Sequence, residues 1–293
     1  MDYKHGKWAK QIVQLQHDDG SWGYFHTLSN PSPKQPITTE QALRRLKVLG
    51  YTYADEPIRK AVSYMHNCLV GKNKLPDREE KLHNWNIFTE LMLAAWITMF
   101  TGEDSAANNA AQKWAEIINA AFTYNEYSND LYISSYRNVF GLNPRGGRLV
   151  DFVSFYQVSL LTNKLNKNIE KAYFKYLLEH ETGIYYIYSK RLLDVPGKFQ
   201  SKETSSYLRA IELLAKYQNP ELKKELGFVL SWINKNKIGD NLWDTGKEIK
   251  DGIDLPLSDS WRNEKNRIED CTYRIKRILN FLDTNNNRSN HRV

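Results

Sequence analysis

The chain has 293 residues, 41% of them hydrophobic and 26% charged, so it is long and apolar enough to bury a substantial core. Its formal net charge is +7, but the 41 basic residues are scattered among 34 acidic ones, which argues against a nucleic-acid partner. No stretch reaches the ~20 apolar residues of a membrane span, and no apolar run follows residues 1–7 as a signal peptide requires. We therefore expect a cytoplasmic protein with no transmembrane segment.

The first predicted element is a helix over residues 8–15, followed by the sequence Gln-His-Asp-Asp-Gly-Ser-Trp-Gly at residues 16–23. Asp19 and Gly20 are a turn pair, and glycine supplies the permissive backbone that ends a helix. Trp22 offers a large flat apolar face to a neighbouring helix. These residues predict a tight connection between two packed helices.

A helix opening recurs along the rest of the chain, in which hydroxyl or acidic residues precede an apolar stretch with helical spacing. The five openings are at residues 38–43, 86–91, 151–156, 203–208 and 269–274. Counted from Thr39, Thr89, Ser154, Thr204 and Thr272, they stand 50, 65, 50 and 68 residues apart. Second helices are predicted between them, at residues 56–69, 106–122, 168–180 and 220–234. This cadence predicts an all-α chain of about five helical hairpins.

The connections between these helices differ greatly in length. The long ones are predicted at residues 26–37, 124–149, 193–202 and 239–263. Connections of such length in compact proteins are often functional. The tail at residues 284–293 is polar and rich in asparagine, so we expect it to be disordered and residues 1–283 to form a single domain.

The spacing Gln-x-x-Asp-Gly-Ser-Trp-Gly at residues 16–23 resembles the QW repeat of squalene and hopene cyclases, which recurs more loosely in protein prenyltransferase β subunits. Weaker echoes, with a glycine and an aromatic residue beyond a helix end, occur at residues 178–185 and 232–243. The resemblance implies an α-α toroid in which the repeat joins successive helices. It also implies structural roles for Gln16, Asp19, Gly20 and Trp22, with the glutamine bonded across the helix ends and the tryptophan stacked against it.

The catalytic signatures of that family are missing from the sequence. The cyclases protonate an alkene with an Asp-x-Asp-Asp run, and the chain contains none. Protein prenyltransferases hold zinc with an Asp-x-Cys pair and a later histidine, whereas Asp270 and Cys271 are adjacent here and the only later histidine, His291, is in the tail. Cys68 and Cys271 have no paired or metal-ligand spacing, which indicates free thiols in a reducing compartment. We expect no metal and no cofactor, and the resemblance leaves the reaction unassigned.

Acidic residues at the helix openings gather near one rim if those openings start the inner helices of a toroid. A carboxylate there can act as a general acid, a general base or a cation stabiliser. Helix capping is the competing interpretation, and it accounts for most of these acids. Asp270 is the candidate exception, and Asp259, in the last long connection, is the second candidate catalytic carboxylate.

Two candidate ligand-binding segments remain. Arg145 and Arg148 flank Gly-Gly before a helix predicted at residue 149, which suits a phosphate, diphosphate or carboxylate; the alternative is a flexible basic turn. Trp243, Trp261 and Arg262, in the connection that also holds Asp259, suit the mouth of a cavity for an apolar or sugar-like ligand. The alternative for this segment is a loop that its own tryptophans fix to the body.

Three functions follow from these patterns. The first is a cyclase- or prenyltransferase-like protein that binds an apolar or prenyl-type ligand, with Arg145 and Arg148 as an anion clamp. The second is a carbohydrate-active toroid, a lyase or hydrolase, that uses Asp259 or Asp270 with aromatic platforms. The third is a non-catalytic binding or scaffold protein. The partner is a small apolar or anionic molecule in the first case, and the sequence does not indicate an oligomeric state.

Overall fold

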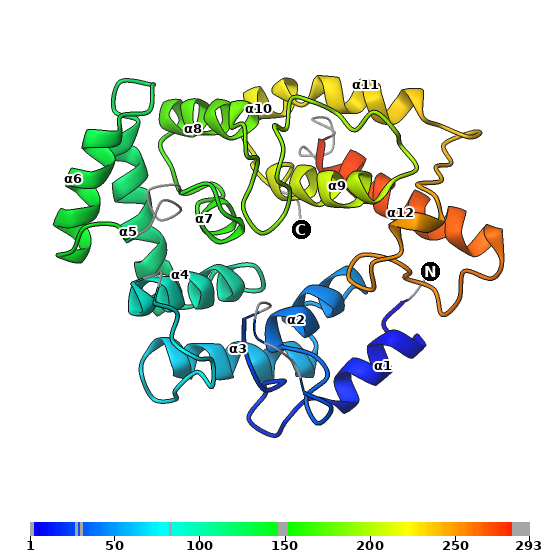
Figure 1. Cartoon of the computed structure of the whole chain (residues 1–293), viewed down its shortest axis with the longest axis horizontal. Coiled ribbons are helices and arrows are strands. Elements are labelled where there is room, and N and C mark those ends of the chain that lie inside the picture. The colour runs from blue at the N-terminus through cyan, green and yellow to red at the C-terminus, as the bar shows by residue number, and fades with distance from the viewer. Residues whose placement is uncertain (1–2, 27–28, 30–31, 82–83, 146–151, 283–293) are drawn as a thin grey trace, which may run out of the picture. The chain divides into compact units, whose positions relative to one another are not determined.

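The computed structural model describes the whole chain except residues 1–2, 27–28, 30–31, 82–83, 146–151 and 283–293. The described residues form twelve α-helices and one 3-10 helix and contain no strand, which confirms the all-α prediction (Figure 1). None of the helices among them is long and apolar enough to cross a membrane. The helices are α1 (Lys7–Gln14), α2 (Thr39–Val48), α3 (Glu56–Leu69), α4 (Trp85–Thr98), α5 (Ser105–Ala121), α6 (Asn129–Phe140), α7 (Phe155–Leu160), α8 (Lys167–Glu179), α9 (Lys202–Leu214), α10 (Pro220–Glu225), α11 (Gly227–Lys235), η1 (Lys247–Ile249) and α12 (Glu264–Leu282).

The chain divides into two compact units. The first consists of Met1–Lys113, Pro144–Val150 and Asp251–Ser260, and the second of Trp114–Asn143, Asp151–Lys250 and Trp261–Val293. The chain therefore leaves the first unit within α5, returns to it at residues 144–150 and 251–260, and belongs to the second from Trp261. The single domain expected for residues 1–283 stays a prediction.

In the first unit α1 packs on α2, and α3 packs on α4. α2 begins with a capping box, because the Thr38 hydroxyl accepts from the Gln41 N–H at 3.2 Å and the Gln41 side chain accepts from the Thr38 N–H at 2.9 Å. Behind this cap Leu43 and Leu46 are fully buried. The second predicted opening also starts a helix, α4, within one residue of the expected position.

The segment 251–260 is bound to the first two helices of the same unit. The Arg45 guanidinium donates to the carbonyl oxygens of Ile253, at 3.0 Å, and Pro256. The Trp8 indole donates to the Ser258 carbonyl at 2.9 Å. Asp259 accepts from the Lys7 N–H at 2.8 Å, so its carboxylate caps α1 from a distant part of the sequence.

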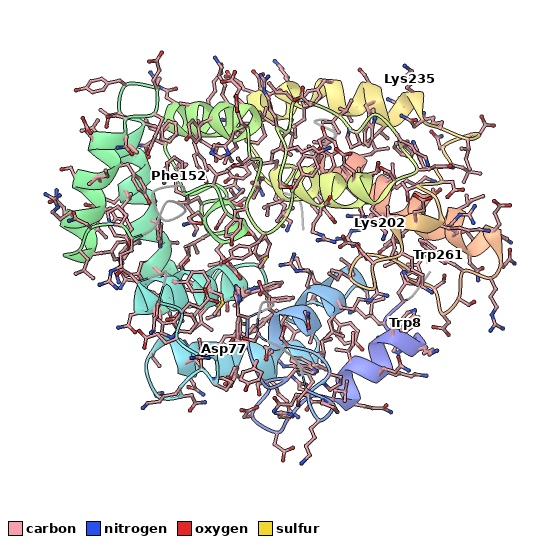
Figure 2. All side chains as sticks on the ribbon, in the orientation of Figure 1. Trp8, Asp77, Phe152, Lys202, Lys235 and Trp261 are labelled. Carbon is pink, nitrogen blue, oxygen red and sulfur yellow. The ribbon has the colours of Figure 1, made fainter. Side chains whose placement is uncertain are left out.

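In the second unit α8 packs on α10, while α9 packs on α7, η1 and α12. An aromatic core surrounds Phe152, which is buried and labelled in Figure 2. The rings with centroids 5.1 to 5.9 Å from that of Phe152 belong to Phe122, Tyr127, Tyr132, Tyr173 and Tyr176. Since such ring pairs add about 0.5 to 1.5 kcal/mol each beyond the area that they bury, this cluster is a main source of stability in the unit.

One helix-exit turn occurs in both units with the same hydrogen bonds. The buried Trp22 indole donates to the Ile12 carbonyl at 2.7 Å, and its backbone N–H donates to the Thr39 hydroxyl at 2.9 Å. The buried Trp243 indole donates to the Ile233 carbonyl at 2.8 Å, and its backbone N–H donates to the Thr272 hydroxyl at 3.0 Å. We call residues 17–23 the Trp22 turn and residues 238–243 the Trp243 turn.

The backbone of the two turns also agrees. His17 N–H donates to the Ser21 carbonyl at 2.8 Å in the first, and Ile238 N–H donates to the Leu242 carbonyl at 3.0 Å in the second. Between each pair lies a residue with positive φ, Gly20 at 93° and Asn241 at 57°. The same short stretch of backbone is therefore built twice from different sequences.

Several predicted elements differ from the structure. Residues 124–149 contain a helix, α6, where a connection was expected; the Ser128 hydroxyl caps it and Gly141, with φ of 70°, ends it. The fifth predicted opening lies inside α12, which starts five residues earlier. The helix expected over residues 220–234 is two helices, interrupted at Leu226. The start of the helix expected at residue 149 and the tail at residues 284–293 lie outside the described residues.

We predict that Gly20→Ala destabilises the protein by about 2 kcal/mol or more. The backbone there has a φ that costs an L-residue roughly 1 to 2 kcal/mol, and a Cβ would lie 2.4 Å from the Lys60 carbonyl oxygen. Thermal unfolding should show a Tm lowered by roughly 4 to 8 °C, at about 2 to 4 °C per kcal/mol. Gly102→Ala, at an open position without positive φ, is the control. Equal unfolding midpoints for the two variants would contradict the role of the Trp22 turn.

Candidate functional site

The aromatic and acidic candidates of the last connection have contacts inside their own units. Trp243 is 1% exposed and forms the Trp243 turn. Trp261, labelled in Figure 2, is half-buried, and its indole donates to Asp270 at 2.7 Å. Asp270 is fully buried in α12. The Trp261 N–H thus occupies one oxygen of Asp270, the carboxylate that the sequence singled out as a catalytic candidate rather than a helix cap.

The remaining candidates are on the surface or outside the described residues. Asp259 is exposed and caps α1 in the first unit, whereas Asp270 belongs to the second unit. Arg145 and Arg262 are exposed. Arg148 lies outside the described residues, so the proposed clamp of two arginines stays a prediction.

A buried ion pair that the sequence did not indicate follows the Trp243 turn. The Arg267 guanidinium donates to both carboxylate oxygens of Asp244, at 2.9 and 2.7 Å, and to Glu264 at 2.6 Å. Asp244 and Arg267 are 6% and 4% exposed. Burial raises the pKa of Asp244. The hydrogen bonds that its carboxylate accepts from Arg267 and from the Gly246 N–H, together with the positive charge of Arg267, lower the pKa by more, so it lies below its usual value.

The first unit contains a cavity of about 550 Å³ between the end of α1 and the end of α3. We call it the α1–α3 pocket. Its walls come from the Trp22 turn, from α3, from the loop after α3 and from Gln35, which precedes α2. The lining residues are His17, Asp19, Ser21, Gly23, Gln35, Tyr64, Lys72, Asn73, Lys74 and Pro76.

The Trp22 turn forms one wall of this pocket, and its polar side chains bond mainly within the turn. Asp19 accepts from the Ser21 N–H at 2.8 Å. The Ser21 hydroxyl lies 3.5 Å from His17 Nδ1 and accepts from the Gly23 N–H at 3.4 Å. The Gln16 side chain, outside the pocket, donates to the carbonyl oxygens of Gly20 and Pro57 at 3.0 and 2.8 Å, which joins the turn to the start of α3.

Tyr64, which is buried on α3, contributes a phenol to the pocket, and Cys68 follows it one turn later. Burial, the neighbouring Cys68 and the charges of Asp19 and Asp77 raise the pKa of Tyr64 far above its usual value. Burial raises the pKa of Cys68 to about 11, and the same two carboxylates add to the rise while the Tyr64 hydrogen bond opposes it. Both groups are therefore protonated at neutral pH and act as neutral hydrogen-bonding groups.

The part of the pocket lining that comes from the loop after α3 is basic. Lys72, Asn73 and Lys74 are exposed on the loop after α3 and line the cavity. The N–H groups of Lys72 and Asn73 both donate to the Asn67 carbonyl, at 2.8 and 3.1 Å, which ties the start of this loop to the helix. The two lysine ammonium groups and the amide side chains of Asn73 and Gln35 suit a small anionic group.

A second cavity, of about 510 Å³, lies at the end of α8 in the second unit. One segment supplies its lining residues, which are Tyr176, Glu179, His180, Glu181 and Thr182. The Tyr176 ring packs on Phe152, with centroids 5.5 Å apart. The described residues contain no group of three histidine, cysteine, aspartate or glutamate side chains that could hold a metal ion.

Sequence reasoning did not find the α1–α3 pocket, although it singled out the turn that forms one wall. The missed residues are His17, Gln35, Tyr64, Lys72 and Lys74. The available signal was the run Lys-Asn-Lys directly after Gly71, which has φ of 76° and follows the end of α3. No protein-family model, curated protein or solved structure matches the chain.

We predict that Asp244→Asn lowers the free energy of unfolding at pH 7 by about 3 kcal/mol, because it removes one partner of a buried ion pair. The wild-type carboxylate has a lowered pKa in the folded state, so its contribution is complete above the unfolded pKa, near 3.9. That contribution is lost as pH falls below the unfolded value and through the lowered folded-state pKa.

Urea unfolding over that pH range measures this contribution. The wild type should lose more stability on acidification than Asp244→Asn does. Asp240→Asn, which removes an exposed carboxylate of the same unit, is the control and should follow the wild type. If Asp244→Asn and the wild type lost equal stability on acidification, the ion pair would not contribute to the pH dependence of the free energy of unfolding.

Proposed function

We propose that the chain is a helical-repeat binding protein that takes a small anionic ligand, with a phosphate or diphosphate group, in the α1–α3 pocket. One observation carries the proposal: Lys72 and Lys74 belong to the lining of an open polar cavity to which four separate parts of the chain contribute. Ligand sites are concave and bring convergent polar groups together from different elements. In this proposal Lys72 and Lys74 bind the anion, in place of Arg145 and Arg148, which the sequence suggested.

Charge in the pocket favours an anion at the lysine rim. The two ammonium groups lie on one loop and carry the positive charge, and Asn73 and Gln35 offer neutral amide donors beside them. Asp19 is the opposing charge among the lining residues, and one of its oxygens accepts from the Ser21 N–H. A ligand with a phosphate group toward the loop and a hydroxyl or amine toward Asp19 fits this distribution.

Binding rather than a reaction is the better-supported function. Cys68 and Tyr64 are protonated at neutral pH because burial raises the pKa of each, so neither is an activated nucleophile. Ser21 is 3% exposed and its hydroxyl accepts a backbone N–H, while its distance to His17 Nδ1 is 3.5 Å. A serine activated by a histidine has a hydrogen bond of about 2.6 to 3.2 Å that is often longer without a ligand, so the low exposure of Ser21 is what argues against a nucleophile here. Non-catalytic binding is therefore preferred to the cyclase-like and carbohydrate-active hypotheses.

We also propose that the helical hairpins close into an α-α toroid. The return of the chain to the first unit supports closure, since residues 251–260 bind α1 and α2 through Trp8, Arg45 and Asp259. The equivalence of the Trp22 and Trp243 turns supports a repeating architecture.

Small-angle scattering tests closure, because a compact chain of this length has a radius of gyration of about 19 Å. A toroid predicts that value, unchanged between low and high salt. A substantially larger radius would mean that the two units move independently and would exclude the toroid.

For the binding function, we predict that pyrophosphate stabilises the protein and that Lys72→Gln/Lys74→Gln binds it at least ~10-fold more weakly. Each lysine supplies a charge-assisted hydrogen bond, partly screened because both side chains are exposed. Calorimetric titration measures the affinity. Lys10→Gln/Lys60→Gln is the matched control, since it removes the same charge from exposed lysines of the same unit outside the pocket.

The choice of probe separates a general anion site from the prenyl ligand that the sequence suggested. Equal affinity for pyrophosphate and geranyl diphosphate means that only the phosphate groups are recognised, whereas a large gain with the prenyl compound means that an apolar surface also takes part. If neither pyrophosphate nor geranyl diphosphate bound to the protein, the proposal would be overturned. Binding of an acidic oligosaccharide alone would favour the carbohydrate hypothesis.

A further inference from the structure

The loop that carries the two pocket lysines is fixed at both ends. At its start, the N–H groups of Lys72 and Asn73 donate to the Asn67 carbonyl of α3. At its end, Asp77 directly follows Pro76, the last pocket residue of the loop. We call residues 72–77 the rim loop. Five peptide units between two anchors leave this segment little freedom, so the second anchor decides how well the lysines are held.

Asp77, labelled in Figure 2, is that second anchor. Its Oδ2 accepts from the Phe25 N–H at 2.7 Å, and its Oδ1 accepts from the His26 N–H and the Ser29 hydroxyl, both at 2.8 Å. Phe25 and His26 are buried and follow the Trp22 turn. A carboxylate with three donors forms strong, short hydrogen bonds, and here they join the rim loop to the segment that follows the Trp22 turn.

We propose that Asp77 is the positioning residue of the α1–α3 pocket, holding the rim loop and its lysines in place before the ligand binds. The inference rests on the proposed anion-binding function and deepens it. A preformed site binds more tightly because the ligand does not have to supply the cost of ordering the loop. Asp77 is absent from the pocket lining, so it acts through Lys72 and Lys74 rather than on the ligand.

The sign of the electrostatic effect makes this role testable. The charge of Asp77 reaches the pocket, since it contributes to the raised pKa values of Tyr64 and Cys68. A negative charge there repels an anionic ligand. Removing it by Asp77→Asn therefore tightens anion binding if charge is all that matters, and weakens it if the carboxylate positions the loop.

The experiment is calorimetric titration of pyrophosphate into the wild type, Asp77→Asn and Asp77→Glu. We expect Asp77→Asn to bind ~10-fold more weakly, the change that corresponds to ~1.4 kcal/mol, and Asp77→Glu to recover part of the affinity. Asp55→Asn is the matched control; it alters a carboxylate that accepts from Lys4 and the Thr52 N–H in the same unit but not at the pocket. It should bind pyrophosphate as the wild type does.

Unchanged or tighter binding by Asp77→Asn would overturn the inference while leaving the proposed function intact. No binding by the wild type would overturn the proposed function and the inference with it. Ser29→Ala keeps the test decisive if Asp77→Asn does not fold, because it removes one of the three bonds to the carboxylate. It should weaken pyrophosphate binding ~2-fold to 3-fold, and wild-type affinity in this variant would count against the anchor.

Discussion

The indole hydrogen bond from Trp22 to the last turn of α1 is the interaction on which the first unit depends. It ties residue 22 to the Ile12 carbonyl, and the backbone N–H of the same residue is bound to Thr39, the first residue of α2. One side chain thus fixes the end of one helix and the start of the next. The intervening turn must pass close to the Lys60 carbonyl, where only glycine fits, so Gly20 is a requirement of the packing.

Buried acids are satisfied by donors of the protein itself, which limits what they can do chemically. Glu40, fully buried in α2, accepts from the Trp96 indole at 3.0 Å, as Asp270 accepts from Trp261. Asp244 binds Arg267 through both oxygens. An indole or guanidinium partner compensates the cost of burying a carboxylate and holds its geometry. Among the described residues, these three carboxylates are therefore held by hydrogen bonds within the structure.

The sequence indicated the helices better than the pocket, for a physical reason. Caps and turns are local, so the Thr38 capping box and the Asp19-Gly20 pair predicted helix boundaries from a few neighbouring residues. α6 was missed because its buried apolar residues, Tyr132 and Tyr136, are both aromatic, and Tyr132 packs on Phe152, a tertiary feature. The pocket was missed for the same reason, since the contacts of Asp77 join residues about fifty positions apart.

The two equivalent turns separate the scaffold from the ligand chemistry. Trp22 and Trp243 make the same bonds, yet the residue six positions before each differs: Gln16 donates to backbone carbonyls, while the Lys237 ammonium lies 5.6 Å from the centroid of the Trp243 ring. Both arrangements keep the turn because the bonds that the two turns share use the backbone, the indole and a threonine hydroxyl. The residue before such a turn can therefore differ between the two repeats while the turn itself is kept.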